Sequence, residues 1–247
     1  MGGKRLLRLV YTERVGGSSP SPTTGRSIRF LGLAFALALC ALLLPTGVLA
    51  DAGSMTFRVE PLQTGGCGAR CPNVIIVADG VIEADTPQAF VDFLRSDSTD
   101  PKLRRFVFFN SRGGNVDASI VFGHILRELK VTGVVGRVEG GTVYVGKCLS
   151  ACVYAMMGTV RRVAPPGSEV ALHRMSTVVT ESGDWSGPTR VTRSVADAPM
   201  VAVLKRYARR MGVSPALVAA AESLPPDTMH VLTREEMRRW SFATGQL

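Results

Sequence analysis

The chain has 247 residues, of which 46% are hydrophobic and 20% charged, and its formal net charge is +9. This length can bury a sizeable core. Residues 1–50 hold six basic residues and one acidic residue, which leaves 23 basic and 19 acidic residues, or +4, in the rest. The remaining Arg and Lys are dispersed or lie beside acids, without interleaved aromatic residues, so the composition excludes a nucleic-acid groove.

Residues 1–50 have the features of an export segment. Scattered basic residues precede an apolar stretch from Leu31 to Leu44, and small side chains surround a cleavage point after Ala50. This order is typical of a signal peptide. The alternative is an N-terminal membrane anchor, with residues 31–50 as the tether, because the apolar run approaches the length that a bilayer needs if Pro45 and Gly47 are counted. Either interpretation predicts an exported, periplasmic protein, free or anchored in the inner membrane.

Four cysteines follow the leader. Cys67, Cys71, Cys148 and Cys152 form two pairs with three residues between the partners. An even number of cysteines in an exported chain favours disulfides over a zinc site or free thiols. Four cysteines allow three connectivities, so the pairing stays open. We expect no bound metal and no cofactor.

Strands and helices alternate in the middle of the chain. Residues 51–72 are rich in glycine and polar residues and predict a linker arm before a domain that spans 73–247. An apolar run predicts a buried strand at 73–79, and the next helix starts with a Thr-Pro pair. The same order then repeats with a glycine turn at 111–114. The expected elements are a helix at 86–96, a strand at 105–110 and a helix at 116–129.

The second half continues this alternation and ends in helices. Residues 132–138 predict a third strand, and 142–145 predict the return of a hairpin. A helix follows Ser150, and short apolar runs follow it at 162–164 and 169–173. The Ser, Thr and Gly-rich segment 174–194 predicts a loop over the site or a contact surface. Helices are expected at 196–211, 215–222 and 234–239. The pattern predicts an α/β fold with right-handed crossovers.

Ser150 is the candidate nucleophile. It lies between a strand-like stretch and an apolar helix, and a lone His173 follows 23 positions later. Free N–H groups at a helix start favour the negative charge that develops in acyl transfer. Three simpler interpretations remain open at this point: Ser150 as an ordinary helix cap, His173 as a buried structural histidine, and Gly113-Gly114 as a plain turn.

Four motifs follow one another along the chain: Asn110-Ser111-Arg112-Gly113-Gly114-Asn115-Val116, Ser150-Ala151, Ala171-Leu172-His173 and Leu232-Thr233-Arg234-Glu235-Glu236-Met237. Their order and spacing resemble the Clp protease proteolytic subunit of the ClpP/crotonase superfamily. The resemblance covers most of the chain after the leader. It implies a ClpP/crotonase-like spiral of βαβ units with C-terminal helices. It also implies that Ser150 is the nucleophile, His173 the general base, and the backbone N–H groups of Gly114 and Ala151 the oxyanion hole.

The chain departs from the family pattern in three places. Arg112 stands where the family usually has proline, and two cysteines flank Ser150. The family has an aspartate about fifty residues after the histidine, but this chain has no acid at the matching position. Glu222 and Asp227 lie nearby in sequence and are the candidates for the group behind His173.

A serine–lysine dyad, as in signal peptide peptidases of the same superfamily, is a less favoured alternative. Lys147 is too near Ser150 in sequence and is expected to point the other way, while Lys205 lies on a helix of unknown placement. His124 and His230 have no motif around them and are expected to be structural.

The expected function is that of an exported serine hydrolase, most simply a peptidase, with a peptide or an unfolded protein as its substrate. An ATPase partner is not expected because the compartment lacks ATP. Homo-oligomers are compatible with the family. The alternative is a catalytically inactive ClpP-like protein that serves as an oligomeric binding or scaffold module. Acyl-CoA chemistry, as in crotonases, is disfavoured by the leader because coenzyme A is cytosolic.

Overall fold

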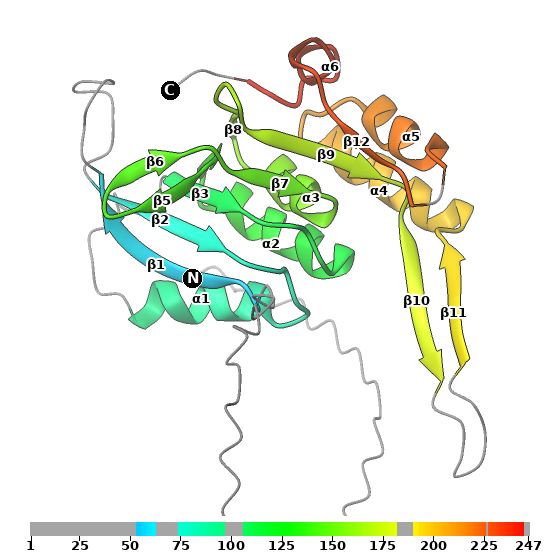
Figure 1. The fold of residues 1–247 in the computed structure, drawn as a ribbon, viewed down its shortest axis with the longest axis horizontal. Helices are drawn as coiled ribbons and strands as arrows, with labels where there is room; N and C mark the ends of the chain where they lie inside the picture. The colour runs from blue at the N-terminus through cyan, green and yellow to red at the C-terminus, as the bar shows by residue number, and fades with distance from the viewer. Residues whose placement is uncertain (1–52, 63–73, 97–105, 182–189, 226, 245–247) are drawn as a thin grey trace, which may run out of the picture. The chain divides into compact units, whose positions relative to one another are not determined.

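Strands and helices alternate along the described part of the chain (Figure 1). The computed structural model describes residues 53–62, 74–96, 106–181, 190–225 and 227–244. The expected leader 1–50, with its tether, and the cysteines Cys67 and Cys71 lie outside these ranges. No helix in the described ranges has the length and apolar character needed to span a membrane.

The main sheet has five strands in the order β1-β2-β3-β4-β8. Four of them run parallel, and β1 is antiparallel to β2. Helix α1 (Thr86–Ser96) connects β2 to β3, and α2 (Val116–Glu128) connects β3 to β4. Parallel strands joined through helices confirm the predicted α/β class. The strands are β1 (Thr56–Pro61), β2 (Val74–Asp79), β3 (Phe106–Asn110), β4 (Thr132–Val135) and β8 (Arg161–Val163).

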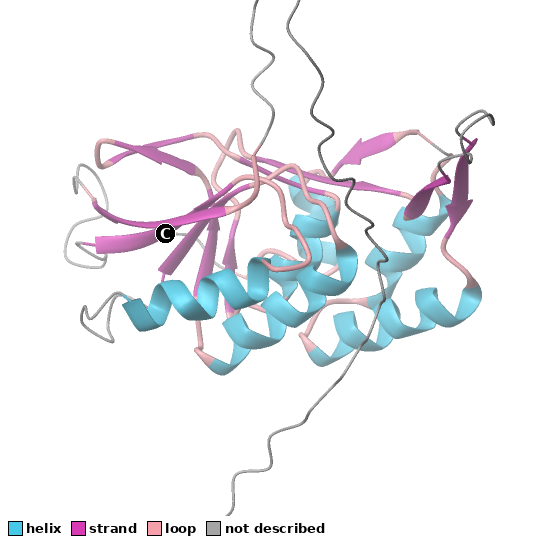
Figure 2. Ribbon diagram, turned by 90° about the horizontal axis from the view of Figure 1, so that it is seen from below, coloured by secondary structure: helices cyan, strands magenta, loops and turns pink. Residues whose placement is uncertain are grey.

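Both faces of this sheet are buried. Side chains alternate between faces along a strand, so Phe109 packs into the larger apolar cluster with the helices and Phe108 into a smaller cluster on the opposite face. Figure 2 shows the helices on one side of the strands. Two-sided burial explains why β2 and β3 are nearly continuous apolar runs in the sequence.

A second sheet of three strands, in the order β12-β9-β7, carries the candidate site. Strands β7 (Lys147–Leu149) and β9 (Glu169–His173) are parallel, and β12 (Met229–Val231) is antiparallel to β9. Strand β12 is not predicted by the sequence, because three residues show no periodicity of their own. Helix α3 (Ala151–Met157) follows β7 directly. The C-terminal part of the chain contains α4 (Ala198–Arg210), α5 (Pro215–Ser223) and α6 (Arg234–Arg239).

Strand β1 corrects the prediction of a linker arm over residues 51–72. Phe57 on this strand stacks its ring at 5.0 Å from Phe90 and at 5.8 Å from Phe122. The packing of this half-buried ring stabilises the strand against α1 and α2 despite the glycine-rich sequence around it. The arm therefore supplies an edge strand of the main sheet.

Two further predictions need correction. The strand expected at 132–138 is split at Gly136, and its second half forms β5 (Arg137–Glu139), which pairs with β6 (Thr142–Tyr144) as a hairpin. The loop expected at 174–194 contains two antiparallel strands, β10 (Ser176–Glu181) and β11 (Arg190–Val195). Both of these strands contain several β-branched Val and Thr residues, which favour extended backbone.

A buried arginine joins the ends of three helices. Arg162 is 2% exposed and donates to main-chain carbonyls that follow or end α3, α4 and α6. Burial, followed by the nearby charge of Arg127, lowers the pKa of Arg162 to about 10, so the guanidinium stays charged at neutral pH. A cation at helix C-termini interacts favourably with the helix dipoles. Arg162 thus anchors the helical layer.

Candidate active site

Ser150 and His173 lie at the ends of two neighbouring parallel strands. Leu149 of β7 pairs with Ala171 of β9, and the N–H of Ser150 donates to the carbonyl of Ala171 over 2.8 Å. Because parallel strands end at the same edge of a sheet, the residues that follow β7 and close β9 come together. The Ser150 hydroxyl and the His173 imidazole are both half-buried.

The backbone of Ser150 is in an unusual conformation. Its φ is 54° and its ψ is −123°, a region that residues with a side chain rarely adopt. Its side chain makes no capping bond to α3; instead Oγ lies 2.6 Å from Nε2 of His173. The interpretation of Ser150 as an ordinary helix cap therefore does not describe this serine.

His173 is held in one tautomer by its second nitrogen. Nδ1 lies 2.6 Å from the carbonyl oxygen of Arg174. A carbonyl only accepts hydrogen bonds, so we assign the proton to Nδ1. The neutral ring then presents an unprotonated Nε2, which can accept the hydroxyl proton of Ser150.

The acceptor at His173 Nδ1 is thus a main-chain carbonyl, whereas the sequence suggests a carboxylate. Glu222, near the end of α5, accepts a hydrogen bond from the N–H of Met175 over 3.2 Å. Burial raises the pKa of Glu222, partly offset by that hydrogen bond and by the charges of Arg174, His173 and Lys205. Asp227 lines a cavity that His173 and Arg174 also line.

The peptide between Gly113 and Gly114 presents a free donor near Ser150. Gly113 accepts a hydrogen bond from the N–H of Ile82 over 2.8 Å. In a trans peptide the C=O and N–H groups point in opposite directions, so the N–H of Gly114 points away from Ile82. Among the described residues, no acceptor bonds to this N–H or to that of Ala151.

Gly113 packs directly against the Ser150 turn. Its φ is +99°, and a Cβ built on it would lie 2.6 Å from the carbonyl of Leu149, 2.8 Å from Cβ of Ser150 and 2.9 Å from the N–H nitrogen of Ala151. Only glycine combines this φ with so close an approach. The glycine pair is therefore part of the site geometry and more than a plain turn.

Asn110 fixes the end of β3 next to this turn. Its Nδ2 donates to Asp79 over 3.2 Å, and its Oδ1 accepts from the N–H of Lys147 over 3.2 Å. One side chain therefore ties β3 to β2 and to β7. The position of Asn110 at the end of an apolar strand is the sequence signal for this role.

A cavity of about 300 Å³ opens over the serine and the histidine. Gly114 forms part of its lining, Val116, Leu172 and Met175 give it apolar walls, and the exposed Arg112 adds a positive charge. The hydroxyl of Ser150 and the imidazole of His173 thus both border this cavity.

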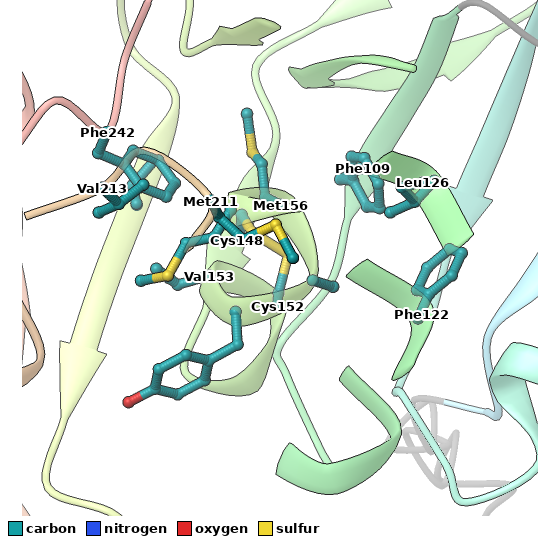
Figure 3. Packing of buried hydrophobic residues seen from close by; sticks show 14 of the residues in the cluster. Phe109, Phe122, Leu126, Cys148, Cys152, Val153, Met156, Met211, Val213 and Phe242 are labelled. Carbon is teal, nitrogen blue, oxygen red and sulfur yellow. A yellow bond between two sulfur atoms is a disulfide. The ribbon is translucent and has the colours of Figure 1, made fainter. Parts of the chain in front are cut away.

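A disulfide brackets the serine. Cys148 in β7 and Cys152 in α3 are joined, with Cα atoms 5.2 Å apart, and both are fully buried. Figure 3 shows them in the apolar core beside Val153, Met156 and Met211. The bond links the strand before Ser150 to the helix after it. The structure thus selects one of the pairings that the sequence left open for these two cysteines.

Other groups considered in the sequence lie apart from the serine. Within the described ranges, neither Lys147 nor Lys205 is hydrogen-bonded to Ser150, as a serine–lysine dyad would require. His230 pairs with Glu236 at 2.9 Å, and His124 packs edge-on against Tyr207. No group of three or more His, Cys, Asp or Glu in that part of the chain could hold a metal ion.

Comparison with known proteins gives similarities of fold only. No protein-family model matches the chain, and no curated protein matches it. Among solved structures, the chain is similar to ClpP1 from Listeria monocytogenes, with 17% identity and a TM-score of 0.47 over 70% of this chain and 90% of that one. It is also similar to a mutant of the 1510-N membrane-bound stomatin-specific protease, with 16% identity and a TM-score of 0.46 over 70% of this chain and 77% of that one. The mixed α/β fold is thus similar to ClpP-like structures, and no statement about chemistry follows from likenesses at this level.

Proposed function

We propose that the chain is a serine hydrolase that cleaves peptide bonds. The observation that carries the proposal is the 2.6 Å contact between Ser150 Oγ and His173 Nε2, made by a serine in a strained backbone conformation with no capping bond to its helix. Strain of this kind is concentrated at functional sites and is typical of a nucleophile on a strand-to-helix turn.

Each proposed step assigns one role to a named group of the chain. Ser150 Oγ attacks the peptide carbonyl while His173 Nε2 takes its proton. The N–H groups of Gly114 and Ala151 stabilise the resulting oxyanion. The C–N bond breaks as Nε2 returns the proton to the leaving amine. Water then attacks the acyl-enzyme, with His173 as base, and releases Ser150.

A peptide substrate is supported by the motif resemblance to the Clp protease proteolytic subunit and by the cavity beside Ser150, which both polar and apolar residues line. The cavity suits short or unfolded segments. Export is part of the proposal and is supported by the leader sequence and by the disulfide between Cys148 and Cys152, because such bonds persist in oxidising compartments. Fractionation of cells, with protease accessibility after outer-membrane disruption, tests the location.

The test of the chemistry is covalent labelling by a fluorophosphonate. Ser150 Oγ displaces fluoride from phosphorus, and intact mass shows one adduct per chain. We expect the wild type and Ser214→Ala to be labelled and Ser150→Ala and His173→Ala to be inert; Ser214 is the control because it also precedes a helix. A folded wild type that takes no label contradicts the proposal and supports the scaffold alternative.

A further inference from the structure

One peptide group stands between His173 and a carboxylate. The carbonyl of Arg174 accepts from Nδ1 of His173 over 2.6 Å, and the N–H of Met175 donates to Oε1 of Glu222 over 3.2 Å. These two groups belong to the same peptide unit, the one that links Arg174 to Met175. An unbroken chain of hydrogen bonds therefore runs from Glu222 to Ser150.

From this arrangement we propose that Glu222 is a positioning residue that acts on His173 through the Arg174–Met175 peptide. The inference rests on the proposed function. It assigns the role of the missing triad acid to a peptide carbonyl backed by a carboxylate, in place of a carboxylate in direct contact with the ring.

The physical basis is polarisation of the peptide. A negative charge near its N–H end polarises the peptide group and shifts electron density toward the carbonyl oxygen. The oxygen becomes a stronger acceptor, because hydrogen bonds in a chain strengthen one another. When His173 takes the proton of Ser150, the ring becomes positive. A stronger acceptor at Nδ1 stabilises that positive ring and fixes its orientation, as the acid of a triad does.

On balance, the surroundings of Glu222 disfavour an ionised carboxylate at this position. Glu222 is the residue before the last of α5, where the helix dipole disfavours a negative charge. Burial raises its pKa, which means that ionised Glu222 costs the fold stability. A residue that breaks a local rule is best explained by function.

The charged and titratable groups around Glu222 come from three other elements. His173 closes β9 and Arg174 follows it, Lys205 projects from α4, and Tyr154 on α3 has its pKa raised by burial and further by the charge of Glu222. The two cations and the Met175 N–H favour the ionised carboxylate and so oppose the effect of burial.

Glu222→Gln separates a charge effect from a purely structural one. The amide oxygen of glutamine can still accept from Met175, so the loop keeps its hydrogen bond but loses the charge. The fluorophosphonate reaction is followed to saturation, which gives the maximal rate of labelling and the half-saturating concentration separately. We expect the maximal rate to fall about fivefold, since a charge-assisted bond is stronger than a neutral one. The half-saturating concentration should not change.

Stability is measured on the same variant. The raised pKa of Glu222 means that the folded chain binds this proton more tightly than the unfolded chain. Wild type therefore loses stability relative to Glu222→Gln as pH rises through the acidic range, and the variant should be at least as stable at pH 8. Glu235→Gln is the matched control, because Glu235 is exposed on α6 and pairs with Arg239; it should leave the labelling rate unchanged.

A second readout needs no chemistry at the serine. In wild-type protein the amide proton of Met175 should shift on titration, with a midpoint above the ordinary range of glutamate, and this transition should be missing in Glu222→Gln. The inference is overturned if wild type and Glu222→Gln have equal maximal labelling rates, or if the chemical shift of the Met175 amide proton does not change with pH. Either result leaves the proposed function standing. A wild type that takes no label overturns both.

Discussion

The start of α3 and the start of α5 both place a serine directly before a helix, yet the two serines do different things. Ser214 has φ −61° and ψ 130°, and its side chain accepts from the N–H of Ala216. Ser150 has φ 54° and ψ −123°, and its side chain turns to His173. The first geometry is that of an ordinary cap, and the second is that of a strained turn.

The difference lies in what surrounds each turn. The N–H of Ser214 donates to the carbonyl of Trp240, after α6, and no side chain is directed at its hydroxyl among the described residues. Ser150 follows a strand whose neighbour ends in a histidine, and a glycine and a disulfide hold its turn in place. Residue type and helix position therefore do not distinguish the two serines; the strained backbone and its supports do.

Gly113 and Gly212 provide the strongest test of that comparison. Each has a positive φ and lies beside one of the two helix starts, but a Cβ on Gly113 would meet the Ser150 turn while one on Gly212 would meet nothing within 4 Å. We expect Gly113→Ala to lower the free energy of unfolding by about 3 kcal/mol and to slow fluorophosphonate labelling at least about 100-fold. Denaturant unfolding and the labelling rate measure the two effects.

Gly212→Ala is the matched control. It carries only the cost of a side chain at positive φ, about 1 kcal/mol, and should label at the wild-type rate. If the two alanine variants label equally fast, Gly113 does not support the Ser150 turn and the contrast between the two helix starts is weakened.

The disulfide is the second support that only the α3 start has. Replacing Cys148 and Cys152 together by alanine should lower the free energy of unfolding by about 2 kcal/mol, the chain-entropy value for a loop this short. Labelling should slow as well, because the turn between β7 and α3 loses its covalent tie. Calorimetry and the rate of fluorophosphonate labelling, each measured on the oxidised wild type and on the double variant, test the two effects.

Full labelling speed in the double variant would show that hydrogen bonds alone hold the Ser150 turn. Wild-type protein treated with reductant in mild denaturant, and checked by peptide mass for free thiols at Cys148 and Cys152, serves as a second route to loss of this disulfide. The two routes should agree in both stability and labelling.

The elements that the sequence predicted best have their own local signals. Helices α4, α5 and α6 directly follow Asp197, Ser214 and Thr233, each of which accepts a capping bond. Strands β1 and β12 were missed because their stability comes from partners far along the chain, such as the pairing of Met229 with His173. Short strands of this kind cannot be recognised from their own residues.

The site shows the same limit. A serine and a histidine at strand ends were predictable as candidates, and the structure joins them by a hydrogen bond. The acceptor behind His173 was not predictable, because it depends on how the backbone turns at Arg174 after β9 ends. Every residue has a main-chain carbonyl, so the sequence cannot indicate which one accepts from the histidine. Glu222 was predictable as a nearby acid, but the peptide group between it and the ring was not.

The smallest expected effects have opposite signs at the two serines. Ser150→Gly should raise the free energy of unfolding by about 1 kcal/mol, because glycine adopts φ 54°, ψ −123° without strain. Ser214→Ala should lower it by about 1 kcal/mol, the usual cost of losing a cap. Urea unfolding at pH 7 measures both. A loss of stability in Ser150→Gly would mean that the hydroxyl contact with His173 contributes more to the fold than the backbone strain costs, and Ser150 would then be a structural residue like Ser214.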